Sequence, residues 1–241
     1  MANEWKDKVA QNFGARALEY DDHSPVQAHI AQNLLKDLPD NKCHDILEIG
    51  CGTGLLTQLL IEKYPNSKLH ITDISDDMIN CARDKVGSAE NITWSIIDGE
   101  TPKTDQKYDL IVANMVVQWF EDIEGGINGL RSLLKPNGKI FYTLPSSENF
   151  KEWRSVLSEL DLPVGLLSIP SSLDIYNKEE IKEDYGTTLD FLRSMKKIGA
   201  HTSYGDYNAL SPSDLLRACR IADQRYKGVM TWQILYGCCS A

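Results

Sequence analysis

The chain of 241 residues is long enough for one α/β domain with a helical cap, and its 42% apolar and 25% charged residues are typical of a globular domain. No apolar run approaches the length that a membrane span needs, so we expect no membrane segment. A net charge of -10 disfavours nucleic acid as the main partner, because binding a phosphate backbone requires a basic face.

The six cysteines and five histidines form no metal-binding or disulfide pattern. The sequence contains no C-x-x-C and no H-E-x-x-H, and only Cys238 and Cys239 are adjacent. This spacing favours a reducing compartment and predicts no metal site. The first twelve residues are polar and mixed in charge, without the apolar core of a secretory signal, so we expect a cytoplasmic protein.

Residues 4–38 carry two runs of apolar residues at helical spacing, separated by the polar stretch 21–25. We therefore expect an N-terminal helical cap over residues 1–40. Tyr20 lies on the apolar face of the first run, where the pattern alone makes it a packing residue.

The stretch 45–54 joins a short apolar strand to a helix through three glycines. Glycine suits this turn because it tolerates positive φ and lets a ligand approach the backbone beside the amide-rich start of a helix. A dinucleotide fingerprint would place its third glycine at position 55, where Leu55 stands. The pattern E-x-G-x-G-x-G instead resembles the first motif of class I methyltransferases, which implies S-adenosylmethionine as the cofactor; a purely structural turn is the alternative. The binding residues implied here are Glu48, Gly50, Cys51, Gly52 and Gly54.

The next apolar run, residues 68–73, predicts a second buried strand that ends in an acid, Asp73. Asp73 follows Gly50 by 23 residues, close to the spacing that lets a carboxylate accept hydrogen bonds from ribose hydroxyls. Ser75 predicts the N-cap of the following helix. Ile74 and Met78 are also expected to bind the cofactor, Met78 near the adenine, with core packing as the alternative for Met78.

Two further strands are predicted at residues 91–97 and 108–114. Asp98 and Gly99 follow the first of them, and in class I methyltransferases an acid here commonly accepts a hydrogen bond from the adenine amino group. Asn114 ends the second strand and is also expected at the cofactor. The chain continues N-M-V-V-Q-W rather than with an N-P-P-Y type motif, which disfavours methylation of the exocyclic amine of a base.

A helix is predicted over residues 123–134, a turn over 135–138 and a fifth strand over 139–144. Four successive strand–helix units predict a Rossmann-like α/β fold. The resemblance to class I methyltransferases implies a mostly parallel, seven-stranded sheet flanked by helices. In such a fold the cofactor lies at the carboxyl ends of the strands. We assign residues 45–145 to the cofactor-binding core of a single domain, 1–241.

Residues 146–200 are predicted to form a lid and substrate-side insertion, and residues 201–241 a C-terminal helix and a final strand at 229–237. The sixth strand is difficult to locate, because the interval between Ile175 and Thr188 is mostly charged. The sequence predicts either a short, irregular strand there or a chain that lacks residues around 183–186.

Four segments outside the cofactor motifs resemble the malonyl-acyl carrier protein methyltransferases of biotin synthesis. They are residues 13–27, 118–119, 191–200 and 231–237, so the resemblance extends over nearly the whole chain. It implies transfer of a methyl group to the free carboxyl of a malonyl thioester on an acyl carrier protein. On this basis we expect Tyr20 to close the cofactor site, and Gln118 and Trp119 to form the pocket wall.

The segment 190–227 is mildly basic within an acidic chain, with seven Lys and Arg residues against four Asp. Because an acyl carrier protein is acidic, we expect it to dock near Arg193, Lys196 and Lys197. Solvated helix faces are the alternative interpretation of these charges.

Three other functions remain open at this point. A methyltransferase for a free small acid, of the aconitate type, shares the cofactor and the carboxylate chemistry. A methyltransferase for a quinone or another small metabolite needs a larger apolar pocket and usually a base. A non-catalytic S-adenosylmethionine-binding module keeps Gly50 to Gly54 and Asp73 without transferring a methyl group.

Overall fold

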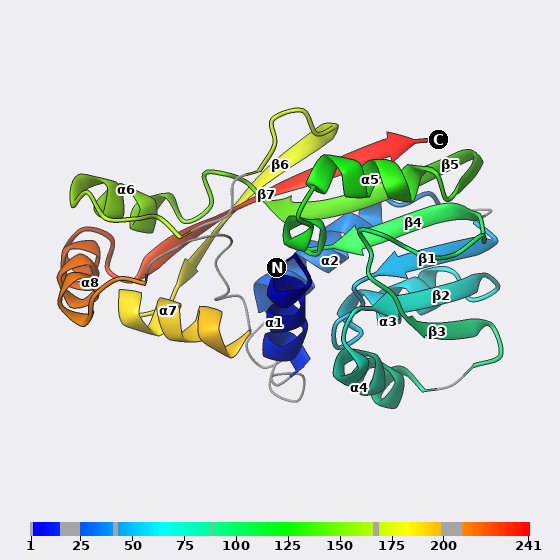
Figure 1. Ribbon diagram of the computed structural model, residues 1–241, viewed down its shortest axis with the longest axis horizontal. Helices are drawn as coiled ribbons and strands as arrows, with labels where there is room; N and C mark the ends of the chain where they lie inside the picture. The colour runs from blue at the N-terminus through cyan, green and yellow to red at the C-terminus, as the bar shows by residue number, and fades with distance from the viewer. Residues whose placement is uncertain (1, 15–24, 41–42, 88, 166–168, 199–208) are drawn as a thin grey trace.

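A computed structural model describes residues 2–14, 25–40, 43–87, 89–165, 169–198 and 209–241 (Figure 1). Its centre is a seven-stranded sheet of order β3-β2-β1-β4-β5-β7-β6, in which β7 runs antiparallel to both β5 and β6 and the other pairs are parallel. This confirms the predicted fold class. The strands are β1 Asp45–Ile49, β2 Lys68–Asp73, β3 Ile92–Ile96, β4 Tyr108–Asn114, β5 Leu134–Pro145, β6 Ile175–Asp184 and β7 Val229–Ser240.

Helices cover both faces of the sheet. Ile46 and Leu47 are successive residues of β1, and their side chains enter separate apolar clusters because side chains alternate across a strand. The cluster around Ile46 includes residues of α2, α3 and α4, whereas the cluster around Leu47 includes residues of α5. The helices are α1 Ala2–Gly14, α2 Pro25–Asp37, α3 Leu55–Lys63, α4 Asp76–Val86, α5 Ile123–Arg131, α6 Lys151–Glu159, α7 Thr188–Lys197 and α8 Pro212–Tyr226, with a short 3-10 helix at Val117–Trp119.

The connection from β3 to β4 differs from the prediction of four strand–helix units. Residues 97–107, all of them described, form turns and extended chain without a helix. Next to this connection the two ring nitrogens of His70 bond to the hydroxyls of Tyr108 and Ser95 at 2.7 and 2.9 Å. Burial lowers the pKa of His70, so a neutral imidazole links three strands on this face.

The turn predicted at residues 135–138 lies inside a continuous strand, β5. Asn137 adopts a φ of 67°, and the β4–β5 register shifts between Tyr108 and Leu110. A Cβ at Gly138 would lie 2.9 Å from the carbonyl oxygens of Lys135 and Tyr108. The Asn-Gly pair therefore makes a bulge that the strand accommodates.

The prediction of a short sixth strand is wrong, whereas the alternative, a chain that lacks residues around 183–186, stays a prediction. β6 spans ten residues in the charged interval, and it pairs with β7 up to Asp184 opposite Val229, with one register shift near its start. It is an edge strand, where charged side chains are common because they protect the open edge from pairing with other chains. Glu179 occupies a half-buried position and accepts hydrogen bonds from Tyr236 and Asn33. β6 lacks an apolar alternation because the hydrogen-bonded carboxylate of Glu179 occupies an inward position, where the pattern of a buried strand would place an apolar side chain.

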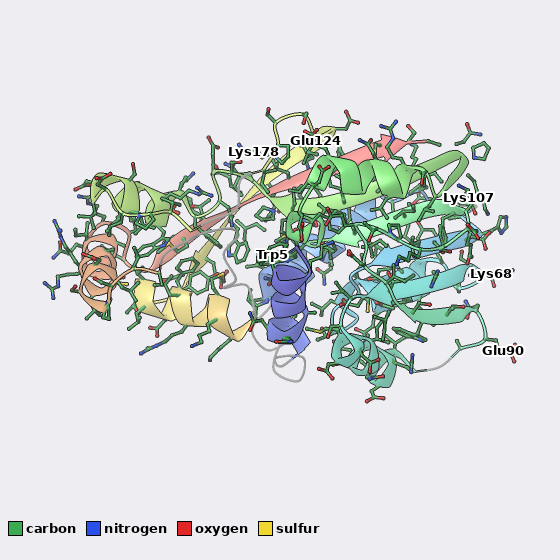
Figure 2. The ribbon with its side chains drawn as sticks, viewed as in Figure 1. Trp5, Lys68, Glu90, Lys107, Glu124 and Lys178 are labelled. Atoms are coloured by element: carbon green, nitrogen blue, oxygen red, sulfur yellow. The ribbon has the colours of Figure 1, made fainter. Side chains whose placement is uncertain are left out.

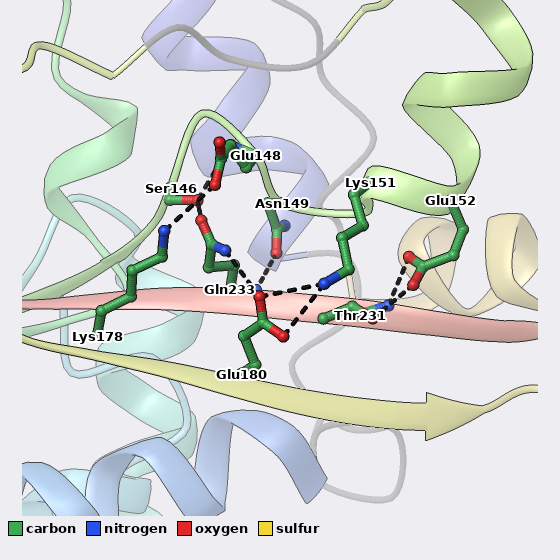
Figure 3. Close-up of polar contacts among 9 residues, drawn as sticks. All are labelled: Ser146, Glu148, Asn149, Lys151, Glu152, Lys178, Glu180, Thr231 and Gln233. Carbon is green, nitrogen blue, oxygen red and sulfur yellow. Dashed lines mark hydrogen bonds and ion pairs between the residues drawn. The ribbon is translucent and has the colours of Figure 1, made fainter.

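Helices α6, α7 and α8 gather at one end of the long strand β7, away from α3 and α4 (Figure 1). At this end β7 extends beyond β5, and the segment that leads into α6 covers its open edge (Figure 3). Gln233 N donates to Asn149 Oδ1 at 2.8 Å, Ser146 N donates to Gln233 O at 2.8 Å, and Thr231 N donates to Glu152 Oε2 at 2.9 Å. Side chains thus replace a strand partner and fasten α6 to the sheet.

Candidate cofactor-binding site

A cavity lies at the carboxyl ends of β1, β2 and β4, beneath helix α1. It holds about 1000 Å³ of empty space, part of which opens to solvent. Its lining includes nearly all of the residues predicted to bind the cofactor. They are Glu48, Gly50, Cys51, Gly52, Asp73, Ile74, Met78, Asp98, Gly99 and Asn114, whereas Gly54 lies just beyond, at the start of α3.

The three glycines of the turn all adopt left-handed φ angles, 68° at Gly50, 53° at Gly52 and 87° at Gly54. Only glycine populates this region without a steric penalty. A Cβ at Gly50 would lie 2.3 Å from Val116, so that position requires glycine for packing as well. A Cβ at Gly52 would meet nothing within 4 Å. The backbone at Gly52 is therefore open to a ligand in the cavity.

Asp73 ends β2 beside this open backbone. Its Oδ2 accepts a hydrogen bond from Gly52 N and its Oδ1 one from Ser75 N, each at 2.9 Å. The side chain lines the cavity, and burial raises its pKa. Ser75 caps α4, as predicted, because its side chain accepts from Met78 N. The carboxylate of Asp73 is thus held at the cavity wall by backbone donors.

Glu48 is the most deeply buried acid of the site, with 1% of its surface exposed. Thr57 Oγ1 donates to Glu48 Oε2 at 2.7 Å. Burial, with a further contribution from the charge of Asp73, raises the pKa of Glu48 to about 8. A cation placed in the cavity would favour the ionised form of both acids.

Helix α1 is tied to the loop after β3 by Lys6, a residue that the sequence analysis did not single out. Lys6 Nζ lies 2.6 Å from Asp98 Oδ2 and 2.7 Å from Glu100 Oε2. Burial lowers the pKa of Lys6, but its bonds to the two carboxylates outweigh this and raise it. One lysine in a polar helix of mixed charge gave no signal, because its importance depends on partners more than 90 residues away.

Trp119 lies in the cavity wall and packs against α1. Its ring centroid is 6.2 Å from that of Trp5, which Figure 2 labels on α1, and 5.4 Å from that of Phe13, the latter edge-on at 77°. Gln118 is buried but does not line the cavity; its Nε2 donates to the carbonyl of Met115 at 2.7 Å. Tyr20 lies outside the described residues.

Gln27 is a second lining residue that the sequence analysis assigned no role at the cofactor. It is on α2, 6% exposed, and lines the same cavity as the glycine turn. In the sequence, Gln27 was noted only as the last residue of the segment 13–27, which resembles the malonyl-acyl carrier protein methyltransferases. A single polar residue inside an amphipathic helix gives no indication of where it points.

The basic residues expected to dock a carrier protein lie on α7. Arg193 is exposed and pairs with Asp190 at 3.0 Å within the same helix. Lys196 and Lys197 are exposed in the last turn.

None of the helices in the described part of the chain is long and apolar enough to cross a membrane. In that same part, no group of three or more His, Cys, Asp or Glu side chains is arranged to hold a metal ion.

Several solved structures have a similar fold, and two of them align over most of this chain. The N-methyltransferase NodS from Bradyrhizobium japonicum, solved with S-adenosyl-L-homocysteine, aligns over 95% of this chain and 98% of its own with a TM-score of 0.54 and 17% identity. The YcgJ protein from Bacillus subtilis aligns over 87% of this chain and 97% of its own, with a TM-score of 0.56 and 14% identity. At these identities the likeness establishes the fold alone.

Sequence comparison is more specific. Residues 47–140 match the model of a methyltransferase domain family. A malonyl-[acyl-carrier protein] O-methyltransferase of Ilyobacter polytropus is 36% identical over 212 residues, 82% of this chain and 82% of its own length. Another from Magnetococcus marinus is 32% identical over 246 residues, 95% of this chain and 91% of its own. The chain therefore belongs to the malonyl-[acyl-carrier protein] O-methyltransferase family.

Proposed function

We propose that this protein transfers a methyl group from S-adenosylmethionine to the free carboxylate of a malonyl thioester carried by an acyl carrier protein. The observation that carries the proposal is the open backbone at Gly52 beside the buried carboxylate of Asp73, in a chain of this family. A cytoplasmic location, where carrier-bound acyl groups are elongated, is part of the proposal.

The residues of the cavity fit the cofactor. Asp73 offers a carboxylate to ribose hydroxyls, and Gly52 leaves space for a ligand against the backbone. Glu48, Asp73 and Asp98 make the wall acidic, which suits a cofactor with a positive charge. When bound, S-adenosylmethionine supplies a sulfonium methyl group; an oxygen of the acceptor carboxylate forms the new bond to carbon as the bond to sulfur breaks.

The protein's own contribution is to position the reactants and exclude water. A carboxylate has a reference pKa near ~4 and is already ionised at neutral pH, so no general base is needed. The reaction neutralises two opposite charges, and a water-poor site favours it. Trp119, packed against Trp5 and Phe13, closes the wall under α1, and we assign Gln118 to the support of that wall. Tyr20 is proposed to complete the closure.

Docking of the carrier protein is proposed at Lys196 and Lys197, which are exposed and stand at the end of α7. An acidic carrier protein meets complementary charge there. Reversing both charges is expected to raise KM for malonyl-carrier protein by about 2- to 30-fold, since each pair of this kind contributes roughly 0.2–1 kcal/mol. Malonyl-coenzyme A, which lacks the carrier surface, is the control substrate; an equal rise in its KM would contradict docking at this helix.

A labelled-methyl assay tests the proposed function. Purified protein and labelled S-adenosylmethionine are incubated side by side with malonyl-carrier protein, malonyl-coenzyme A and free malonate. We expect the highest kcat/KM with malonyl-carrier protein. Preference for free acids would instead indicate an aconitate-type enzyme, and cofactor binding without transfer to any acceptor would indicate a non-catalytic module.

A further inference from the structure

Asn114, at the carboxyl end of β4, has a side-chain amide whose orientation is fixed by one neighbour. Thr143 is fully buried on β5 and stands opposite Asn114 in the β4–β5 register. Its hydroxyl donates to Asn114 Oδ1 at 2.8 Å and accepts from the backbone N–H of Met115 at 3.0 Å. Turning the amide over would deprive the buried hydroxyl proton of its acceptor. The amide oxygen is therefore held toward β5, and the NH2 group is directed away from it.

Met115 holds this arrangement at the cavity wall. It has a φ of 56°, a strained conformation for a residue other than glycine. Its N–H also donates to the carbonyl of Thr143 at 3.1 Å, and its own carbonyl accepts from Gln118 Nε2. Such a conformation persists where the surrounding contacts fix it. These contacts give Gln118 a defined part in placing Asn114.

The NH2 group of Asn114 is the part of the amide that remains for a ligand. Asn114 lines the cavity, and its Nδ2 has no hydrogen-bond partner among the residues that the structure describes. The acids of the wall, Glu48, Asp73 and Asp98, are acceptors when ionised, and Gln27 on α2 is the other lining amide. The ammonium of Lys6 is already bonded to Asp98 and Glu100. An amine acceptor needs an oxygen to accept its hydrogens, whereas a carboxylate needs an N–H donor.

We propose that Asn114 binds the carboxylate of the methyl acceptor through Nδ2, and that Thr143 is the positioning residue that gives the amide this polarity. The inference rests on the proposed function, because it states how the same site recognises its acceptor. An asparagine can present either an oxygen or an NH2 group to the cavity. Thr143 selects the NH2 group, and thereby an anionic oxygen over an amine.

Binding without turnover tests the proposal. In the presence of S-adenosylhomocysteine, calorimetry measures the dissociation constants of malonyl-carrier protein and acetyl-carrier protein, which differ only in the acceptor carboxylate. The wild type is expected to prefer the malonyl form. Asn114→Asp replaces the donor by a like charge and should reduce this preference at least about 10-fold, because a hydrogen bond to a charged group contributes roughly 1.5–3 kcal/mol. Affinity for S-adenosylhomocysteine should stay within about 3-fold.

Two conservative substitutions test the role of Thr143 separately. Thr143→Val removes the hydroxyl at nearly constant shape and should reduce the malonyl preference, whereas Thr143→Ser keeps the hydroxyl and should retain most of it. Thr93→Val, at an exposed position of β3, is the matched control. Thermal unfolding verifies that each variant folds; if Asn114→Asp does not, the Thr143 series carries the test.

Three results would overturn the proposal. An unchanged malonyl preference in Asn114→Asp would show that Asn114 does not bind the acceptor carboxylate. A loss of S-adenosylhomocysteine affinity of more than about 10-fold in that variant would place Asn114 on the cofactor instead. An equal malonyl preference in Thr143→Val and Thr143→Ser would show that the hydroxyl of Thr143 does not orient Asn114. Failure of the proposed function is distinguishable, since it would be seen in the wild type as no malonyl preference and no methyl transfer.

Discussion

Two regions of the central sheet use different means to place their side chains. At the carboxyl ends of β1 and β2, backbone conformation does most of the placing: glycines with positive φ expose the chain at Gly52, and backbone N–H groups hold Asp73. At the start of β7, side chains do the placing, as Glu152 and Asn149 bond to the backbone of β7 where it extends beyond its pairing with β5. We expect changes in the first region to affect ligand binding, and changes in the second to affect the stability of α6–α8.

The largest effect is expected from Gly52→Ala. The added Cβ meets no protein atom but occupies the side of the backbone that faces the cavity, so affinity for S-adenosylhomocysteine should fall at least about 30-fold, while the strain of a positive φ costs about 1 kcal/mol of stability. Calorimetry measures the first effect and thermal unfolding the second. Gly186→Ala is the matched control, because Gly186 has a φ of 77° and open space around its Cβ, but lies between β6 and α7. An equal loss of affinity in both variants would contradict the assignment of Gly52 to the cofactor.

Glu152→Ala tests the second region, at the start of β7. It leaves the buried N–H and hydroxyl of Thr231 without their acceptor, which should reduce the free energy of unfolding by roughly 2–3 kcal/mol. Affinity for S-adenosylhomocysteine should not change. Glu159→Ala, at the exposed end of the same helix, should leave the melting temperature almost unaltered. If Glu152→Ala weakened cofactor binding as strongly as Gly52→Ala, the two regions would not be separable.

Glu48 makes a smaller, pH-dependent contribution. Its pKa rises on folding from 4.5 to about 8, so the folded state binds a proton more tightly, and stability falls as pH increases between these values. Glu48→Gln removes this dependence, and the ligand-free variant should be at least as stable as the wild type at pH 8. Chemical denaturation at pH 5, 6.5 and 8 measures the slope. A wild-type stability that rises over this range in parallel with the variant would show that Glu48 ionises normally.

What could be predicted from the sequence follows the same division. β2 and β4 lie at the predicted bounds, because each is an apolar run that ends at a polar residue, Asp73 or Asn114. The helix cap at Ser75 was predicted from local chemistry and is confirmed. β6 was not located, since its inner face carries Glu179, whose partners Tyr236 and His29 are far away in the chain.

The candidate site was predictable to the same extent. Glu48, Gly52 and Asp73 belong to local motifs, and their positions around one cavity were expected from the topology of a parallel sheet. Lys6 and Thr143 act through contacts with residues that only the fold brings near, Asp98 and Asn114 respectively. No spacing in the sequence encodes such contacts, so their roles could be inferred only from the folded structure.

Calorimetric titration of S-adenosylhomocysteine into the wild type and into Asp73→Ala is the most direct test of the central claim, that the cofactor lies against Gly52 with its ribose held by Asp73. We predict one binding site in the wild type and an affinity at least about 30-fold lower in Asp73→Ala, because two hydrogen bonds to a charged group are lost. Asp76→Ala, in the exposed first turn of α4, should bind like the wild type. No binding by the wild type, or equal affinity in Asp73→Ala, would contradict the claim.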